Sequence, residues 1–384
     1  MKKILFDLTS LNSFGKTQYH GGGEYSKEFL LELQKYKQSS EMYYLFDGEY
    51  EYIDDQVRDK IPEKRVLYIE KIYEIPDILR GGGFDAFISG LPYKYRRLNF
   101  GTIECFFTIH GLRRIELPYD STEFRYSDKI KNRLMFFFRK YLTENYVRIK
   151  KKHISDLLKS SVNTNIIVVS EHTKFSILSN FKDIQENQLS VSYSFLARRR
   201  IEQIDSEVCS IGKFYLMVST HRWVKNAYRA AKAFDKLFSQ GRLNTKVVLL
   251  GMNEKIFSKF GIKNKSHFIL KGYVSRNQYE SFMKAAYALV YPSLNEGFGY
   301  PPYEAMKYGT PVAMGAASSL NEIYDNRNSL FFNPYDINEI ALRILELEYW
   351  DLMKTETDSI IREAEELEIK QQIMSDKLMA RIFS

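Results

Sequence analysis

The chain has 384 residues, of which 44% are hydrophobic, 15% aromatic and 27% charged. This composition is ordinary for a globular protein, its many Tyr and Phe residues argue against intrinsic disorder, and its length predicts two domains. No apolar segment approaches the roughly 20 residues of a membrane-spanning helix. The two cysteines, Cys105 and Cys209, lack metal-ligand spacing, so we expect a reduced, cytoplasmic protein without structural disulfides.

The net charge of +8 is concentrated in the first half of the chain. Residues 1–200 hold 33 Lys and Arg against 26 Asp and Glu, a net +7, while residues 201–384 hold 23 against 22, a net +1. Most of the excess lies in 125–152, with ten basic and two acidic residues. The excess predicts an anionic partner, either membrane lipid or a phosphate-bearing acceptor. Nucleic acid is not expected, because no finger, RNA-recognition or helix-turn-helix pattern accompanies the basic segment.

Short apolar runs recur at helix-sized intervals in the first 200 residues, which predicts a parallel sheet flanked by helices. These runs are 3–8, 43–46, 66–69, 84–89, 103–109 and 166–169. The first run is too short for a signal peptide. It is followed by a polar loop that contains Gly21, Gly22 and Gly23, and then by an amphipathic helix over 25–33, the form of a ligand-binding crossover. The glycines do not match the dinucleotide fingerprint, and a plain flexible turn is the alternative.

His110 follows the apolar run 103–109, at the carboxyl end of a buried strand. Ligands bind at that edge of an open α/β sheet. A histidine there could orient a hydroxyl or share a proton near neutral pH. A purely structural histidine is the alternative interpretation.

Residues 125–158 mix basic side chains with apolar ones at helical spacing. The apolar positions are Leu134, Phe137, Phe138, Tyr141 and Leu142. A helix that lies at a membrane interface has this pattern, and so does an ordinary amphipathic helix with a basic solvated face. Both interpretations stay open.

A second α/β series begins near residue 200, where the pattern restarts, and we expect the domain boundary there. The expected domains are 1–200, 201–350 and a helical tail, 351–384, that crosses back to the first domain. Strands are expected at 214–219, 246–251, 268–274, 287–291, 312–314 and 330–332. The loop after the first of these carries Arg222 and Lys225 ahead of a helix, where cations could clamp a diphosphate.

The strand at 287–291 leads into the loop 292–300, which contains Glu296 and two glycines. Two prolines then suit the first turn of a helix, and Gly309 ends it after about two turns. One carboxylate therefore precedes a helix N-terminus, and a second, Glu304, lies in its first turns. Flexible backbone with N–H groups at a helix start is an anion site. The layout predicts a grip on a phosphorylated sugar ligand.

The stretch EGFGYPPYEAMKYGTPV resembles the retaining glycosyltransferases of family 4, whose motif is a Glu, seven residues and a second Glu, here Glu296 and Glu304. FYLMVSTHRWVKN, VVLLG followed by GYVS, SSLNEI and LFFNPYD are also similar to the family, across 213–350. In the first half, GGGEYSK, TIHGL and IIVVSEHTK resemble it more loosely. The resemblance implies the GT-B fold, two Rossmann-like parallel-sheet domains with the active site in the cleft between them.

The resemblance also implies roles for individual residues. Glu296 would contact hydroxyls of the donor sugar, and Glu304 would accept hydrogen bonds from the nucleotide ribose. Arg222 and Lys225 would neutralise the diphosphate leaving group, and His110 would face the sugar from the other domain. The remaining donor-binding residues that it implies are Gly297, Phe298, Gly299, Tyr300, Gly272, Tyr273, Val274, Asn226, Gly22 and Gly23.

Three departures from the family pattern matter. LSVSYSFLARRR stands where many members have Pro-Asn-Gly, and Arg222 lies three residues before Lys225 where many members have five. The chain has no Asp-x-Asp motif, so we expect no metal and no other cofactor, with basic side chains and a helix dipole in place of the cation.

The sequence therefore predicts a retaining, metal-independent hexosyltransferase. It would move a sugar from a nucleotide-sugar to a hydroxyl of a glycan or lipid-linked acceptor in bacterial-type surface polysaccharide assembly. The membrane-helix interpretation would place it at the inner face of the cell membrane. Glu296 could be the nucleophile of a double displacement, or could position the sugar for attack on the same face. The alternatives are a non-catalytic sugar-nucleotide-binding partner subunit and a GT-B-like phosphorylase or epimerase.

Overall fold

The computed structural model describes residues 2–11, 21–47, 57, 59–127, 129–325, 329–349 and 357–384. The contacts divide the chain into two compact units. Unit 1 comprises Met1–Ile115, Val147–Ala197 and Lys370–Ser384, and unit 2 comprises Glu116–Tyr146 and Arg198–Ile369. These units differ from the predicted domains, which stay predictions, because residues 116–146 join unit 2 and the last helix is divided between the units.

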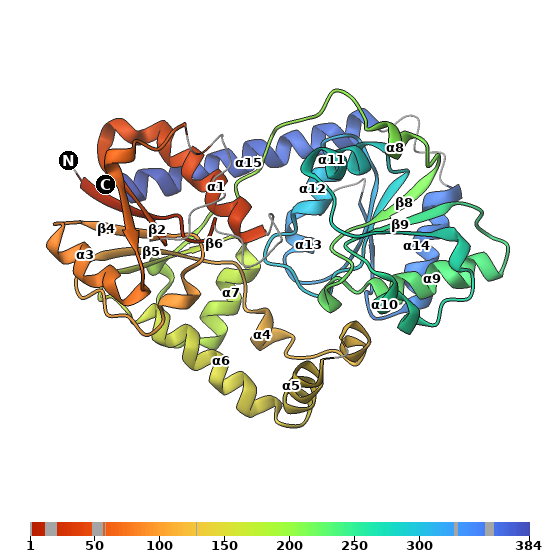
Figure 1. The fold of residues 1–384 in the computed structure, drawn as a ribbon, viewed down its shortest axis with the longest axis horizontal. Coiled ribbons are helices and arrows are strands. Elements are labelled where there is room, and N and C mark those ends of the chain that lie inside the picture. Colours follow the sequence, from red (N-terminus) through yellow and green to blue (C-terminus); the bar gives the residue numbers. More distant parts are fainter. Residues whose placement is uncertain are drawn as a thin grey trace. The chain divides into compact units, whose positions relative to one another are not determined.

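Unit 1 is built on a seven-stranded parallel sheet in the order β3-β2-β1-β4-β5-β6-β7 (Figure 1). Its strands are β1 (Lys2–Asp7), β2 (Ser40–Asp47), β3 (Val66–Ile69), β4 (Ala86–Ser89), β5 (Glu104–Ile109), β6 (Thr164–Val168) and β7 (Leu189–Val191). The six predicted strands of this half are confirmed. The seventh, β7, was not predicted, because three residues are too short a run to show a period.

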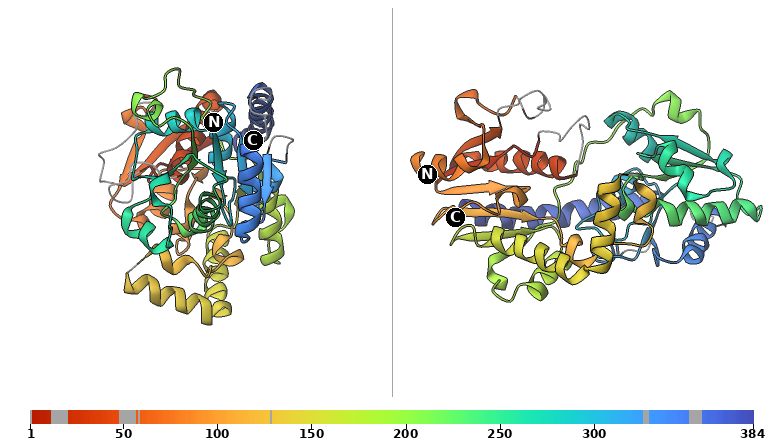
Figure 2. Two further views of the ribbon diagram at one scale, coloured as in Figure 1. Left: turned by 90° about the vertical axis from the view of Figure 1, so that its right-hand side faces the viewer. Right: turned by 60° about the horizontal axis from the view of Figure 1, so that its bottom comes forward.

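Helices cover both faces of this sheet because the side chains of each strand alternate between two apolar layers. The helices with residues in unit 1 are α1 (Gly21–Leu33), α3 (Ile75–Gly81), α4 (Arg113–Glu116), α6 (Thr143–Leu158), α7 (Glu171–Asn180) and α15 (Thr357–Phe383). Leu5 of β1 joins a core with residues of α6 and α7, whereas Phe6 packs on Phe29 of α1 with ring centroids 5.5 Å apart. Figure 2 shows α1 on the opposite side of the strands from α7.

The prediction of a glycine loop at Gly21–Gly23 is wrong, because these glycines form the first turn of α1. A Cβ on Gly22 would lie 2.4 Å from the Leu91 side chain, so the missing side chain lets Leu91 approach the helix. The Gly22 carbonyl accepts a hydrogen bond from Ser26 at 3.1 Å. Close packing accounts for Gly22 within unit 1.

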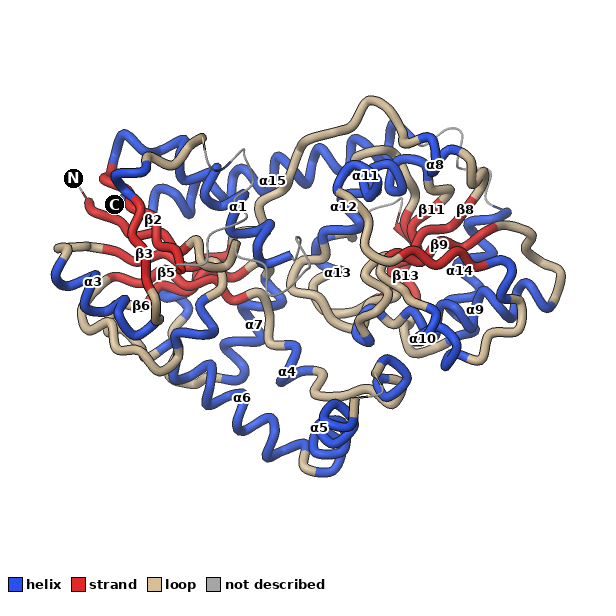
Figure 3. The backbone as a smooth tube through the Cα atoms, in the orientation of Figure 1, coloured by secondary structure: helices blue, strands red, loops and turns tan. Residues whose placement is uncertain are grey.

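Unit 2 is built on a six-stranded parallel sheet in the order β10-β9-β8-β11-β12-β13 (Figure 3). Its strands are β8 (Phe214–Met217), β9 (Lys246–Leu250), β10 (Phe268–Lys271), β11 (Ala288–Tyr291), β12 (Val312–Gly315) and β13 (Ser329–Phe332). All six predicted strands of this half are confirmed. They read as continuous apolar runs because both faces of the sheet are buried.

The helices with residues in unit 2, besides α4, α6 and α15, are α5 (Ile130–Tyr141), α8 (Ser206–Cys209), α9 (Ala227–Ser239), α10 (Glu254–Phe257), α11 (Arg276–Ala285), α12 (Tyr300–Met306), α13 (Leu320–Ile323) and α14 (Ile337–Tyr349). Tyr215 of β8 faces a core shared with α9 and α14. Its neighbour Phe214 packs on Phe282 of α11, on the other face. Among the described residues, no helix combines the length and the apolarity that crossing a membrane requires.

Candidate functional site

The strand order of unit 2 locates its ligand edge. From β8 the chain winds outward through β9 to β10 and then returns to β11 on the other side of β8. The loops after β8 and β11 therefore diverge from two adjacent strands, which makes the switch point where open α/β sheets bind ligands. The loop after β8 carries Arg222 and Lys225, and the loop after β11 carries Glu296. Topology thus brings together residues that lie about seventy positions apart.

Lys225 and Glu296 form a direct ion pair at this switch point. The Lys225 ammonium lies 2.5 Å from the Glu296 Oε1 atom, and the two side chains are only 7% and 13% exposed. The same carboxylate oxygen accepts hydrogen bonds from the Tyr291 hydroxyl at 2.8 Å and from the Ser293 hydroxyl. Lys225 also donates to the Tyr291 hydroxyl. Lysine, tyrosine and serine donors together hold one carboxylate oxygen.

The pKa of Glu296 reflects this surrounding. Burial alone would raise it, but the Lys225 ammonium and the hydrogen bonds from Lys225, Ser293 and Tyr291 bring the pKa below its ordinary value. Burial, with the Glu296 charge beside it, raises the pKa of Tyr291 well above its usual range. At neutral pH Glu296 is therefore an anion that can accept hydrogen bonds or attack an electrophile, and it has no proton to donate.

Three residues with left-handed backbone lie in the loops that carry or contact the pair. Ser219, Asn226 and Ser318 are the non-glycine residues with positive φ in the described part of the chain, at 52°, 56° and 49°. All three lie in loops that follow β8 or β12. Ser318 uses its hydroxyl to accept the N–H of Glu296 at 2.7 Å. Such conformations cost of the order of 1 kcal/mol or more each and cluster at functional sites, where the surrounding structure holds them.

The second predicted carboxylate, Glu304, lies in α12 and is tied to α11. Its Oε1 atom is 3.0 Å from Arg276, and its Oε2 atom accepts a hydrogen bond from the Tyr279 hydroxyl at 2.6 Å. Burial and the Glu304 charge raise the pKa of Tyr279 well above its ordinary value. Each carboxylate oxygen has a second lone pair, so Glu304 keeps the capacity to accept a ligand hydroxyl. Its predicted ribose contact stays a prediction.

Gly299 connects the Glu296 loop to α12. It has a φ of 90°, and a Cβ there would meet Leu320 at 2.6 Å, so only glycine suits the position. Its carbonyl accepts a hydrogen bond from Tyr324 at 2.5 Å, and Phe298 packs beside the Tyr300 ring, 5.4 Å between centroids. The helix start proposed as an anion site contains two prolines, so fewer N–H groups are available there than an ordinary first turn offers.

Arg222 and Asn226 differ in how their side chains are used. Arg222 is exposed, and within the described ranges it makes no salt bridge. Asn226 is fully buried, donates to the Pro334 carbonyl at 2.6 Å and accepts from Arg229 at 3.0 Å. Both the nitrogen and the oxygen of its amide are therefore already hydrogen-bonded. Its donor-binding role stays a prediction.

The residues predicted to border a base follow β10, at the same edge of the sheet. Gly272 and Tyr273 are exposed, Val274 is half-buried, and Ser275 then caps α11 by accepting the Gln278 N–H. No side chain reaches the Cβ position of Gly272, so its backbone is accessible. Their contact with a nucleotide base stays a prediction.

In unit 1, His110 follows β5 at the carboxyl edge, as its position in the sequence predicted. Its Nε2 atom lies 2.8 Å from the Gly90 carbonyl, and its ring is nearly perpendicular to the Tyr25 ring, with centroids 4.6 Å apart. A carbonyl only accepts, so Nε2 carries the proton. The contact of His110 with a donor sugar stays a prediction, as do those of Gly22 and Gly23, which α1 now contains.

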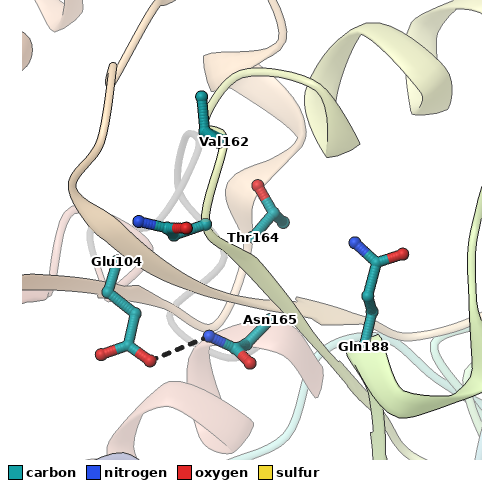
Figure 4. Close-up of a pocket in the computed structure, with 6 residues that line it drawn as sticks. Glu104, Val162, Thr164, Asn165 and Gln188 are labelled. Atoms are coloured by element: carbon teal, nitrogen blue, oxygen red, sulfur yellow. Dashed lines mark hydrogen bonds between the residues drawn. The ribbon is translucent and has the colours of Figure 1, made fainter.

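A pocket of about 400 Å³ lies at the opposite, amino-terminal edge of the unit 1 sheet (Figure 4). Its lining is mostly polar and consists of Glu104, Val162, Asn163, Thr164, Asn165 and Gln188. Asn165 donates to Glu104 at 3.0 Å, as the dashed line in Figure 4 shows. The pocket is at the wrong edge of the sheet for the predicted ligand. In the described ranges, no group of three or more His, Cys, Asp or Glu residues could hold a metal ion.

The sequence reasoning missed several residues around the pair. The sequence places Tyr291 at the end of the predicted strand 287–291 and Ser293 in the loop 292–300, but no role was predicted for either residue. Their spacing from Glu296, five and three residues along a tight loop, was the available signal. The contacts that residues 116–126 make with the rest of unit 2 left no sequence signal, because they join segments about a hundred residues or more apart.

Comparison with known proteins places this site in a family context. Residues 203–371 match the model of the glycosyl transferases group 1 family. The matched range includes β8 to β13 and both members of the ion pair. The O-antigen chain mannosyltransferase RfbU of Salmonella typhimurium is 28% identical over 193 residues, 49% of this chain and 52% of that protein. The O-antigen chain mannosyltransferase B of Escherichia coli is 25% identical over 224 residues, 55% and 58% of the two chains. The chain spans little more than half the length of these curated relatives.

Solved structures are similar over the whole chain. A glycosyltransferase from Rickettsia africae has a TM-score of 0.62 at 15% identity and covers 100% of this chain and 97% of its own. Anabaena Alr3699/HepE in complex with UDP and glucose has a TM-score of 0.65 at 13% identity, with 100% and 99% covered. At such low identity the similarity concerns the fold alone. Together with the two parallel-sheet units, it shows the predicted GT-B fold.

The ion pair has a measurable energetic signature. Replacing Lys225 by Met leaves Glu296 buried beside an apolar side chain, and we expect a loss of about 3 kcal/mol in the free energy of unfolding. The double variant K225M/E296Q removes both charges and should recover most of that loss. Urea denaturation of the wild type, both single variants and the double variant measures the cycle. Additive losses would contradict a direct interaction.

The lowered pKa of Glu296 predicts a specific pH dependence of stability. Because the folded pKa lies below the usual value of about 4.3, the pair stabilises the protein above that pH, and the contribution is lost as pH falls through the folded pKa. In K225M burial raises the pKa instead, so acid should favour that variant relative to the wild type. Denaturation between about pH 3 and 7 measures both slopes. Parallel curves for the two proteins would contradict the assignment.

Proposed function

We propose that this chain is a glycosyltransferase that moves a sugar from a nucleotide-sugar donor to a hydroxyl of a glycan or lipid-linked acceptor. The observation that carries the proposal is the Lys225–Glu296 pair at the switch point of unit 2. It lies within the residues that match the glycosyl transferases group 1 model. The pair and the exposed Arg222 together carry a net positive charge at the edge where an α/β sheet holds phosphates.

The charges suggest that each charged side chain contacts a different group of the donor. The diphosphate would lie against Lys225 and Arg222, whose positive charges stabilise the negative charge that builds on the leaving group. The Glu296 carboxylate, ionised at neutral pH, would accept hydrogen bonds from sugar hydroxyls. Glu304, already fixed by Arg276 and Tyr279, would accept the ribose hydroxyls.

We further propose that transfer retains the anomeric configuration and needs no metal ion. Retention is what the resemblance of the Glu296–Glu304 stretch to the family 4 glycosyltransferases implies, and the basic side chains Arg222 and Lys225 support transfer without a metal ion. An anionic Glu296 fits either route to retention, a double displacement through this carboxylate or same-face attack assisted by the leaving phosphate. The configuration of the product separates retention from inversion.

The relatives suggest the sugar and the pathway. RfbU and the Escherichia coli enzyme are named O-antigen chain mannosyltransferases, so mannose is the first sugar to test and surface polysaccharide the first acceptor class. The HepE structure contains UDP and glucose, which makes a glucosyl donor the second candidate. A phosphorylase would need inorganic phosphate as co-substrate, and a non-catalytic binding subunit would bind the donor without turnover.

The predicted membrane contact of 125–152 is also a proposal, and α5 carries it. Ile130, Leu134 and Tyr141 are 74%, 64% and 70% exposed, and Phe137 between them is exposed too. Their spacing of four, three and four residues places them on one face of the helix. This face, defined by these four residues, has the apolar character of a surface that enters the headgroup boundary of a bilayer.

The basic side chains of α5 favour an anionic lipid surface as the partner of this face. Lys131, Arg133 and Lys140 are exposed on the same helix, and residues 129–152 contain nine Lys or Arg against the single acid Glu144. Each basic side chain near an anionic bilayer contributes about 1 kcal/mol. Phe136 alone of α5 is buried, so unit 2 covers little of the helix. Such a contact would hold the protein at the inner face of the cell membrane.

A thermal-shift screen tests the proposed function first. Mannose and glucose linked to UDP, GDP, dTDP and ADP are the ligands, because a donor that binds only the folded protein raises its melting temperature. The donor that binds is then assayed with polysaccharide and lipid-linked acceptors, with and without a chelator. Binding without any transfer would favour the non-catalytic subunit, and the absence of any shift would contradict the proposal.

Replacing Glu296 by Gln keeps the shape and removes the charge. We expect the transfer rate to fall by at least about 100-fold, because the sugar loses a charged acceptor and Lys225 loses its partner. Glu254→Gln, an exposed carboxylate of α10, is the control and should leave the rate unchanged. Product formation from the identified donor is the measurement. An E296Q rate equal to that of E254Q would remove Glu296 from the mechanism.

Replacing Leu134 by Asp places a charge in the α5 face. We expect sedimentation with vesicles of phosphatidylglycerol and phosphatidylcholine at low salt to fall at least tenfold, because the carboxylate resists burial in the headgroup region. Ile369→Asp is a matched control, since Ile369 is 61% exposed on α15 and the net charge changes equally. Equal losses in both variants, or no binding by the wild type, would end the membrane proposal.

A further inference from the structure

Residues 116–126, here called the brace segment, contact both loops of the Lys225–Glu296 pair. The segment precedes Lys225 by about a hundred residues but belongs to unit 2. Two of its acidic residues, Glu116 and Asp120, bond to side chains beside the pair. Neither contact follows from the resemblance or from the family match, which begins at residue 203.

The first contact is a buried ion pair between Asp120 and Arg229 of α9. Two guanidinium nitrogens of Arg229 lie 3.1 and 3.0 Å from the two carboxylate oxygens of Asp120. Both side chains are buried, and the guanidinium also lies over the Tyr335 ring, 5.2 Å from its centroid. Asp120 in turn accepts the N–H and the hydroxyl of Thr122. Arg229 is therefore fixed in one orientation.

Arg229 in turn holds the side chain of Asn226, the residue that follows Lys225. It donates to the Asn226 side-chain oxygen at 3.0 Å, and the Asn226 amide donates to the Pro334 carbonyl at 2.6 Å. Asn226 has a φ of 56° and joins the turn Trp223–Lys225 to α9. The left-handed conformation of Asn226 directs the chain out of the Lys225 turn, and bonds at both ends of its side chain hold that conformation.

The second contact reaches the residue that precedes Glu296. The Asn295 amide donates to the Glu116 carboxylate at 2.6 Å, and Asn295 is buried. The adjacent Leu294 N–H donates to the Val224 carbonyl at 2.9 Å, which joins the two loops. The brace segment thus bonds directly to the neighbour of Glu296 and, through Arg229, to the neighbour of Lys225, while the backbone bonds the loops to each other.

The end of the brace segment is anchored in the core of unit 2. The Tyr228 N–H donates to the Tyr126 hydroxyl at 2.8 Å, and the Tyr126 ring packs on Phe260. Arg125 donates to the Lys259 carbonyl at 2.9 Å and lies over the Tyr228 ring. The segment therefore provides a fixed support for the two loops.

We propose that the brace segment sets the distance and orientation between Lys225 and Glu296, with Asp120 and Arg229 as positioning residues. A buried bidentate pair contributes little net stability compared with apolar packing, but its directional bonds hold Asn226, and through it the Lys225 turn, in one geometry. Asp120 and Arg229 would act through Asn226, and Glu116 would act through Asn295. This inference rests on the proposed function for its catalytic consequence and on the contacts alone for its structural one.

Asp120→Asn tests the brace and has a matched control in the same segment. Glu123 forms an ion pair with Arg139 that is also mostly buried, 12% and 15% exposed, and within the described residues it bonds to neither Asn226 nor Asn295. Hydrogen exchange at amides 223–228 and 293–297 is the first readout. We expect at least tenfold faster exchange at 223–228 in D120N, with E123Q like the wild type. Equal exchange in D120N and E123Q would overturn the proposal.

The second readout is the transfer reaction with the donor found for the wild type. We expect D120N to lower kcat at least tenfold with KM changed less than threefold, because a displaced Lys225 and Glu296 can still bind the donor but fit the transition state less well. The double variant D120N/R229Q should lose no more than D120N alone, since both changes remove one link. Additive losses would overturn the proposal. If D120N does not fold, Glu116→Gln applies the same readouts at 293–297.

Failure of this inference is distinguishable from failure of the proposed function. A wild type that transfers no sugar with any donor contradicts the proposed function, while the exchange measurement still decides the brace. A wild type that transfers sugar, with D120N behaving like E123Q in both readouts, contradicts the brace alone.

Discussion

The ion pair between Lys225 and Glu296 is the interaction on which the rest of unit 2 depends. Two charges 2.5 Å apart and mostly shielded from water persist only when hydrogen bonds compensate for their lost hydration. Tyr291 and Ser293 supply them on the carboxylate. The strand order brings the two residues together. After β10 the chain returns to the other side of β8, so that β11 pairs with β8. A phosphate-bearing ligand would find here a lysine already desolvated and oriented.

Holding the pair requires an unfavourable backbone. Asn226 and Ser318 adopt left-handed conformations, which are unfavourable for residues that have a Cβ atom. Each has a compensating contact, Asn226 through Arg229 and Pro334, and Ser318 through the Glu296 N–H. The loops are therefore ordered before any ligand arrives, and preorganisation of this kind lowers the cost of binding and of charge stabilisation.

The sequence predicted the two parallel sheets well, because strands buried on both faces appear as apolar runs between helices. It also predicted the positions of Lys225, Glu296 and Glu304 in their loops and helix, since glycine and proline mark turns and helix starts. It failed where the signal was weak or remote. The three residues of β7 are too few to show a pattern, and the glycines of α1 resemble a loop in composition although they form a helical turn against Leu91.

Long-range contacts were beyond the sequence altogether. Nothing in residues 116–126 indicates that Asp120 pairs with Arg229, because acidic residues in a loop are usually solvated. The choice between a solvated and a membrane-facing α5 was equally open, because both have the same helical period. Exposure of Ile130, Leu134 and Tyr141 in the folded chain is the observation that favours a partner for that face.

The most direct test of the account is the affinity of nucleoside diphosphates for the wild type and for Lys225→Met, measured by isothermal titration calorimetry. If Lys225 holds the diphosphate at the switch point, the diphosphate of the matching base should bind K225M at least about tenfold more weakly, a loss of about 1.4 kcal/mol. Affinity for the nucleoside alone should stay the same. Equal diphosphate affinity for the two proteins would contradict the claim that this ion pair marks the donor site.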